Sequence, residues 1–310
     1  MTDLASVHSW PTLERPLLVT VMEGWIDAGA AAAAAVSTLL ASMPHDLVAT
    51  FDADELLDYR ARRPVLRIVN GVDTELTWAE IRLHHATNRT GRSVLLLTGP
   101  EPDMRWHRFV REVVQLAARL GVELVVGLGA FPAPVPHTRP VRLVGTSTDS
   151  ELAGRVGYLP AGIDVPAGVQ GALEFAFGEA GIPAVGLWAR VPHYASAMPY
   201  PAASAALLEG LARIAAIEVD TTSLRTAAAA TNKQIQQLIA ASEEHSAMVH
   251  QLEQQHDQEE GMSATDFGDL PSGDEIAAEL ERFLRGDRGD RGDRGDRGDL
   301  GDLGDLGDRG

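Results

Sequence analysis

The segment Leu124-Val-Val-Gly-Leu-Gly-Ala-Phe-Pro-Ala-Pro-Val-Pro-His-Thr-Arg-Pro140 decides the fold. Its first five residues form an apolar run without polar alternation, which is typical of a strand buried on both faces of a parallel sheet. Gly127 and Gly129 allow the backbone to turn, and the four prolines that follow predict that strand pairing ends there. We therefore expect a stiff loop at the carboxyl end of a central strand, where open α/β sheets usually bind ligands or partners.

Strand and helix patterns alternate on both sides of this segment. Apolar runs predict strands at residues 17–22, 46–51, 65–69, 93–98, 124–128, 141–145 and 184–191. Amphipathic or alanine-rich stretches predict helices at residues 28–40, 103–120, 168–179 and 202–217, with Asp27 and Asp103 as caps of the first two. Residues 1–15 are expected to form a loose lead-in. This alternation defines an α/β fold.

One pair of strands carries a strong turn signal. Asn70-Gly71 follows the run at 65–69 and predicts a tight β-hairpin. The return arm, residues 75–85, alternates polar and apolar side chains, which indicates one solvated face. We therefore expect this hairpin at the edge of the sheet.

Composition excludes several classes of protein. The 310 residues carry a formal net charge of −18, which argues against a nucleic-acid partner because such affinity comes largely from neutralised phosphates. Cysteine is absent, and no phosphate-binding loop or dinucleotide fingerprint occurs, so we expect neither a cofactor nor a metal. The most apolar stretch, residues 28–41, is too short to span a membrane, and no basic region precedes an apolar core near residue 1, so we expect no signal peptide. We expect a cytoplasmic protein without membrane contact.

The composition changes after the α/β region, which we place at residues 1–220. Residues 221–257 repeat apolar side chains in alternating steps of four and three, which predicts one long coiled-coil-like helix. Residues 258–285 indicate an acidic linker with a short amphipathic helix. Residues 286–310 repeat Gly-Asp-Arg and then Gly-Asp-Leu, which predicts a disordered tail.

Several loops that leave the predicted strands bring polar side chains to one sheet edge. A carboxylate, an imidazole, a guanidinium and an indole could together bind a small polar molecule. The same residues could instead form a structural network, in which Asp103 caps a helix and Arg139 pairs with Glu101. The candidate residues are Glu23, Trp25, Asp27, Glu101, Asp103, Arg105, Trp106, His137, Arg139, His193 and Tyr194.

Five short motifs together resemble the actinobacterial branch of the PAC2 family, which is named for its similarity to the second proteasome assembly chaperone. They are Glu23-Gly-Trp-Ile-Asp-Ala-Gly29, Arg62-Arg-Pro64, Leu97-Thr-Gly-Pro-Glu-Pro-Asp-Met-Arg-Trp106, Pro136-His-Thr-Arg-Pro140 and Val191-Pro-His-Tyr194. The resemblance covers residues 16–257 and again 270–285. It implies a three-layer α/β/α sandwich with a mostly parallel central sheet, similar to nucleoside phosphorylases and hydrolases, and an oligomeric assembly.

The resemblance favours a protein-binding chaperone or scaffold that acts as a homo-oligomer, with a possible further protein partner and no chemistry of its own. The alternative is a small-molecule hydrolase, or a nucleosidase- or phosphorylase-like enzyme, that uses the loops of Glu101, His137 and Arg139. We also expect Arg139→Ala to destabilise the fold more than His137→Ala, on the premise that Glu101 or Asp103 pairs with the guanidinium.

Overall fold

The computed structural model describes residues 4–24, 26–158 and 162–261. All helices and strands below belong to one compact unit, formed by residues 1–160 and 166–267. Residues 162–165 lie outside this unit and form no helix or strand. The predictions for Trp25, for the segment after residue 261 and for the repeat tail lie outside the described residues.

An eight-stranded sheet forms the centre of the unit, in the order β1-β3-β6-β7-β2-β8-β10-β9. The four strands β7, β2, β8 and β10 are parallel, and antiparallel strands extend the sheet on both sides. The bounds are β1 (Ala5–Val7), β2 (Leu17–Glu23), β3 (His45–Phe51), β6 (Ile81–Thr87), β7 (Ser93–Pro100), β8 (Leu124–Ala133), β9 (Leu143–Ser147) and β10 (Ala184–Pro192).

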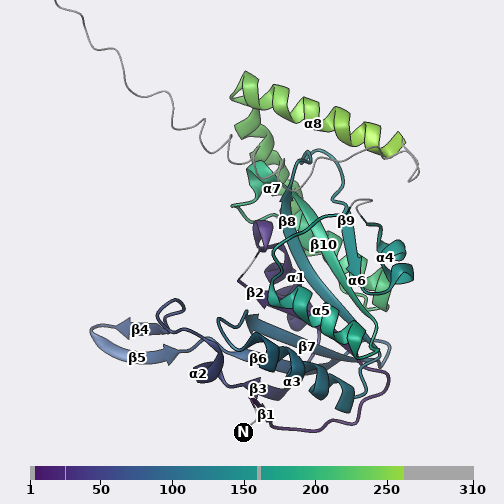
Figure 1. Cartoon of the computed structure of the whole chain (residues 1–310). Helices are drawn as coiled ribbons and strands as arrows, with labels where there is room; N and C mark the ends of the chain where they lie inside the picture. Colours follow the sequence, from purple (N-terminus) through teal and green to yellow (C-terminus); the bar gives the residue numbers. More distant parts are fainter. Residues whose placement is uncertain (1–3, 25, 159–161, 262–310) are drawn as a thin grey trace, which may run out of the picture. The chain divides into compact units, whose positions relative to one another are not determined.

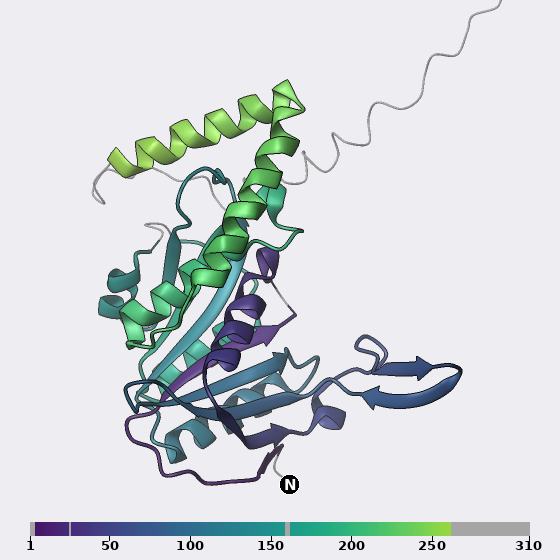
Figure 2. The same cartoon turned by 180° about the vertical axis from the view of Figure 1, so that it is seen from behind.

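Helices cover both faces of this sheet, so the predicted α/β/α sandwich is confirmed (Figures 1 and 2). Side chains of α1 (Ala31–Ser42) and α6 (Pro201–Ala215) fill one apolar core. Those of α3 (Trp106–Arg119) and α5 (Val169–Glu179) fill a second core on the opposite face. The short helix α4 (Ser150–Val156) packs beside β9. The parallel strands are apolar on both faces because each face contacts a helix layer.

The decisive strand β8 is longer than the sequence predicts. It continues through the first proline, and Pro132 and Ala133 still align with Val191 and Pro192 of β10. The expectation that the prolines end the pairing is wrong for Pro132. Beyond Gly127 the pairing of β8 with β2 has ended, and apart from one isolated bridge between Ala130 and Asp27 the strand pairs with β10. A residue without an N–H is tolerated where one side of a strand is open.

The predicted hairpin is present but is separate from the main sheet. Strands β4 (Val65–Val69) and β5 (Val72–Thr77) pair only with each other, and Asn70 and Gly71 both have positive φ, as the tight turn requires. The expected return arm is two strands, β5 and β6, and only β6 joins the main sheet. We call residues 65–77 the β-arm; it projects away from the sheet in both views (Figures 1 and 2).

Two further expectations are wrong at the ends of the unit. Residues 1–15 are not wholly loose, since β1 pairs with β3. The single long helix expected at 221–257 is two helices, α7 (Thr222–Ala240) and α8 (Glu243–Gly261). Ser242 separates them; its hydroxyl accepts from His245 N–H, which caps the second helix. Among the described residues, no helix has the length and apolar content needed to cross a membrane. The remaining elements are η1 (Ala28–Ala30), α2 (Ala53–Leu56) and η2 (His193–Ala195).

Candidate functional site

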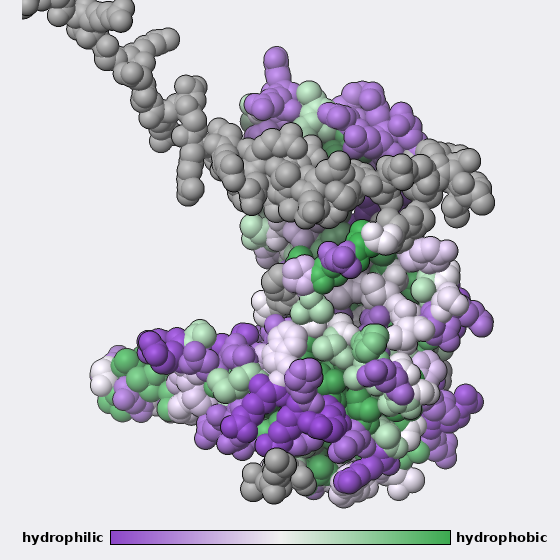
Figure 3. All heavy atoms as spheres, in the orientation of Figure 1, coloured by the Kyte–Doolittle hydropathy of each residue, from purple (hydrophilic) through white to green (hydrophobic). Residues whose placement is uncertain are grey.

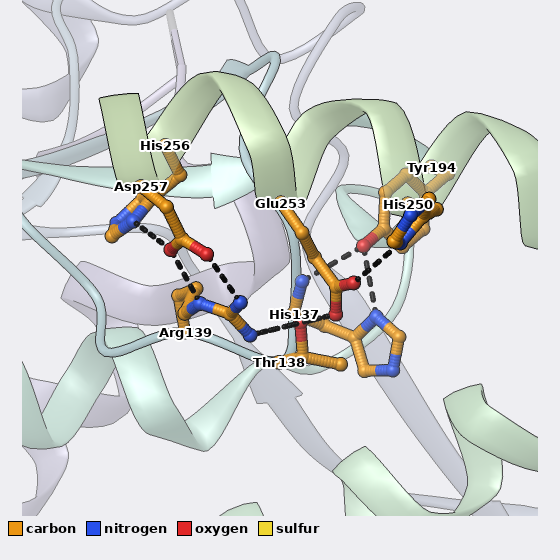
Figure 4. Close-up of polar contacts among 8 residues, drawn as sticks. All are labelled: His137, Thr138, Arg139, Tyr194, His250, Glu253, His256 and Asp257. Atoms are coloured by element: carbon orange, nitrogen blue, oxygen red, sulfur yellow. Dashed lines mark hydrogen bonds and ion pairs between the residues drawn. The ribbon is translucent and has the colours of Figure 1, made fainter. Parts of the chain in front are cut away.

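Arg139 joins the loop after β8 to helix α8 (Figure 4). Its Nε and Nη2 donate to the two carboxylate oxygens of Asp257 at 2.8 and 2.7 Å, which is a bidentate pair. Its Nη1 lies 3.5 Å from Glu253 Oε1. The expected pairing of Arg139 with Glu101 or Asp103 is therefore wrong. Both acidic partners come from a helix more than a hundred residues further along the chain.

His137, two residues before Arg139, is anchored to Tyr194 rather than to α8. The His137 backbone N–H donates to the Tyr194 hydroxyl oxygen at 2.8 Å, and the ring Nδ1 lies 2.9 Å from the same oxygen. We assign the hydroxyl as the donor to Nδ1, which places the ring proton on Nε2. Burial lowers the pKa of His137, and burial raises the pKa of Tyr194 to about 12, so both side chains are neutral at pH 7.

Helix α8 presents its polar contacts at the spacing of one helix face. His250, Glu253 and Asp257 are separated by three and four residues, and Glu253 Oε1 accepts from the Thr138 hydroxyl at 2.5 Å. The hydrogen bond from Thr138 lowers the pKa of Glu253, and the hydrogen bond from Arg139 lowers that of Asp257. Both carboxylates of α8 are therefore charged where they contact the loop after β8.

These α8 residues are not among the candidate site residues predicted from the sequence. The heptad pattern was the sequence signal that could have identified them. Val249 and Leu252 occupy its apolar positions, and His256 follows at the next one, four residues after Leu252. All three side chains are buried, at 6%, 7% and 4% exposure. This pattern places Glu253 and Asp257 beside the buried seam. The choice of the β8 loop as their target depends on tertiary structure.

The loop after β7 forms a second, separate group of contacts. Glu101 Oε2 accepts from Val169 N–H at 2.7 Å, at the start of α5, and Arg105 pairs with Glu55 at 2.7 Å. The expectation that Asp103 caps α3 is wrong. Its carboxylate instead accepts from Asp58 N–H at 2.8 Å and pairs with Arg62 at 3.2 Å. The Trp106 indole donates to the Pro102 carbonyl. These side chains fix the loop to α2 and to the segment that leads into the β-arm.

The remaining candidates have local roles. Asp27 accepts from the N–H groups of Ala32 and Ala33 at 2.8 and 3.0 Å, so its capping of α1 is confirmed. Burial raises the pKa of Asp27. The carbonyl oxygen of Glu23 accepts from Glu101 N–H at 2.6 Å. His193 contacts the Tyr194 ring edge-on, with centroids 5.3 Å apart. The predicted residues therefore form two groups rather than one convergent pocket.

The carboxylates of the two groups already have partners. Within the described part of the chain, no cluster of three or more His, Asp or Glu residues could hold a metal ion. Each carboxylate of the two groups accepts a backbone N–H or pairs with an arginine. The polar atom that stands out is His137 Nε2, which is buried without a hydrogen-bond partner among the described residues.

The β-arm exposes several large apolar side chains, and Figure 3 shows hydrophobic residues on it among hydrophilic ones. All residues of β4 and β5 are exposed. At its base, Tyr59 and Trp78 stack edge-on with centroids 4.7 Å apart, and the Tyr59 hydroxyl donates to Asp54 at 2.7 Å. The large apolar side chains are 44–68% exposed and comprise Val65, Leu66, Ile68, Val69, Val72, Leu76 and Trp78.

The protein is an α/β/α sandwich. A hairpin projects from it, and helix α8 is bound to the loop after β8. The sequence model of the PAC2 family matches residues 21–239, which is more than half of the chain. The protein therefore belongs to the PAC2 family, and the resemblance found in the sequence is confirmed.

Solved structures of bacterial relatives agree with this assignment. A protein of unknown function from Corynebacterium glutamicum is 33% identical with a TM-score of 0.78, over 83% of this chain and 97% of that one. Rv2714 of Mycobacterium tuberculosis is 36% identical with a TM-score of 0.77, over 83% and 92%. The proteasome-assembly chaperone homologue Rv2125 of the same organism is 38% identical with a TM-score of 0.70, over 75% and 99%. A comparison with curated proteins found no match.

Proposed function

We propose that the protein is a chaperone-like scaffold that binds other protein chains, and that its first partner is a second copy of itself, bound through the β-arm. The observation that carries this proposal is the exposure of large apolar side chains on both strands of the arm. Isolated apolar residues are normal on protein surfaces, but a contiguous apolar patch is typical of an interaction site.

The arm is suited to contact another chain because its own sheet has two open edges and no helix layer. A two-stranded ribbon is at best marginally stable alone in water, so a partner that covers it would stabilise it. The arm also carries Arg67 opposite Glu75, with 3.9 Å between their charged groups, so two copies would offer each other both signs of charge. The pairing supports self-association over binding to a strongly charged partner.

The chaperone-like role is supported by family membership and by Rv2125, whose structure is described as a proteasome-assembly chaperone homologue. A pull-down from native lysate tests this role, with wild-type protein compared with a variant that carries Leu66→Glu and Ile68→Glu. We expect wild type to recover a protein partner at stoichiometric yield and the variant to recover less. Equal recovery by both proteins would show that the arm is not the binding surface.

The enzyme alternative has one specific observation in its favour, which is the buried neutral imidazole of His137 beside the Tyr194 hydroxyl. A hydrolase or nucleosidase would need a substrate within reach of this pair. A thermal-shift screen with nucleosides and small carboxylates, repeated with His137→Asn, tests it. A ligand-dependent shift in wild type that is lost in the variant would favour the enzyme over the scaffold.

A further inference from the structure

Helix α5 exposes a large aromatic side chain on its outer face. Phe175 is 62% exposed. The apolar side chains of the opposite face, Val169, Leu173 and Phe177, are buried in the core between α5, α3 and the sheet. A helix that covers a sheet usually turns polar or charged side chains to water. In Figure 3, hydrophobic residues lie over α5 among hydrophilic ones, so this face departs from that rule.

The residues that neighbour Phe175 on this face are small. Gly171 and Ala172 precede it by four and three positions, which places them beside it on the helix surface. A Cβ atom on Gly171 would make one ordinary contact, with the Ala167 side chain at 3.6 Å. The backbone of α5 is therefore accessible next to the aromatic ring, and another chain can approach it closely.

The β-arm has one face that matches this surface. Leu66 lies opposite Leu76 in the register of β4 and β5, and Ile68 follows Leu66 on the same face. Leu66, Ile68 and Leu76 are 45%, 59% and 49% exposed. The other face carries Arg67 opposite Glu75, which form an ion pair. A contact that excludes water therefore forms with least cost on the Leu66 face, since no ion pair has to be desolvated there.

The two apolar surfaces do not cover each other within one chain. The β-arm projects away from the sheet in both views, whereas α5 packs over β8 and β10 (Figures 1 and 2). Phe175 and the apolar side chains of the arm are consequently exposed together in the single chain. Each copy thus offers two different apolar surfaces to other copies, and a contact between different surfaces is heterologous.

The charges beside the two surfaces are complementary. Residues 60–72 carry four arginines and no acidic residue, whereas α5 carries two glutamates and no basic residue. The return strand β5 carries two acidic residues, and α3, which packs beside α5, exposes Arg111 and Arg119. With β4 on the side of α5 and β5 on the side of α3, each sign of charge meets the opposite one. Such complementarity fixes the orientation of a contact.

We propose that α5 is the docking surface of the β-arm: the face of Leu66, Ile68 and Leu76 in one copy covers Phe175 in a second copy. This inference rests on the proposed function, because it assumes that the arm binds a second copy. The neighbour's helix supplies the covering layer that a two-stranded ribbon lacks. Phe175 acts as the central aromatic anchor, which is the kind of residue that dominates the affinity of interfaces.

Sedimentation equilibrium of the full-length protein tests this docking surface. Phe175→Glu should raise the dissociation constant of the oligomer by about 30-fold, because a charge replaces the aromatic anchor. Leu238→Glu makes the same kind of change at a side chain of α7 that is 66% exposed, and it should leave the constant unchanged. If Phe175→Glu leaves the oligomer intact while Leu66→Glu with Ile68→Glu dissociates it, the inference is overturned and the proposed function stands. A monomeric wild type would overturn both.

Crosslinking identifies which surfaces meet. The chain has no cysteine, so an introduced thiol reports a single position. Copies with Leu66→Cys and copies with Phe175→Cys, after exchange of subunits, should be joined by a short bis-maleimide crosslinker. Leu66→Cys alone, or mixed with Leu238→Cys, should not be joined. Crosslinking of Leu66→Cys alone would show that two arms meet each other, and this result, or an oligomer without a crosslink between positions 66 and 175, would overturn the inference.

Discussion

The β-arm and helix α8 are both additions to the same α/β/α unit, and they treat their apolar side chains in opposite ways. The arm leaves Val65, Ile68 and Val72 between 59% and 68% exposed. Helix α8 buries Val249 and Leu252 and fastens its polar face to Arg139 and Thr138. An element that stabilises its own chain buries its apolar face, whereas an element that exposes it is available to another chain.

Removal of each addition should therefore have different consequences for the stability of the unit. Truncation after Ser242 uncovers the buried seam of α8, and we expect the free energy of unfolding to fall by about 2–4 kcal/mol. At protein concentrations where the chain is monomeric, replacement of residues 65–77 by a short Gly-Ser turn should leave it unchanged within about 0.5 kcal/mol. Urea unfolding of both variants makes the measurement.

The matched control for that truncation ends the chain after Arg285. The removed tripeptide repeat has no apolar periodicity, so we expect no change in the urea midpoint. If the arm replacement lost as much stability as the Ser242 truncation, the claim that α8 stabilises the unit and the β-arm does not would be wrong.

Single substitutions sharpen the account of the α8 side. His137→Ala removes a ring that is 3% exposed, together with its contact to Tyr194, and should cost about 3 kcal/mol in a urea titration. Tyr194→Phe keeps the packing and removes only the hydroxyl, so it should cost about 1 kcal/mol. Equal costs for the two variants would show that the hydroxyl, rather than the buried ring, anchors the loop.

Arg139→Ala should cost less, about 1 kcal/mol, because the guanidinium and its Asp257 partner are 32% and 49% exposed. This order reverses the one that the sequence suggests, since the premise of a buried partner on the β7 loop does not hold. The same urea titration at low and high salt checks it, with a smaller cost expected at high salt. A cost above that of His137→Ala would restore the original order.

Acid should loosen α8 before it affects the arm. The pKa values of Glu253 and Asp257 are lowered by their bonds to Thr138 and Arg139, so their contribution to stability is present at neutral pH and is lost as the pH falls through these values. Burial lowers the pKa of His137, and its contribution is lost as the pH falls below about 6.5. Hydrogen exchange of α8 amides between pH 7 and pH 4, with Arg139→Ala as the control, should show this loss in wild type.

Local patterns in the sequence predicted the parallel centre of the sheet and the tight turn at Asn70-Gly71. An unbroken apolar run and two residues that readily adopt positive φ depend only on their neighbours in the sequence. Local patterns failed where the outcome depends on a distant partner. Pro132 remains in β8 because the pairing of β8 with β2 has already ended there. Asp103 accepts from Asp58 N–H instead of capping the helix that follows it. Arg139 pairs with Asp257, which lies 118 residues further along the chain.

The central claim, that the β-arm binds a second copy of the chain, is tested most directly by sedimentation equilibrium of the full-length protein. Wild type should sediment as an oligomer, whereas Leu66→Glu with Ile68→Glu should raise the dissociation constant by roughly 100-fold, as the loss of two interface anchors implies. Thr74→Glu with Thr77→Glu adds the same charge to polar positions of the arm and should keep the oligomer. A monomeric wild type, or an oligomer that survives the Leu66 and Ile68 changes, would contradict the account.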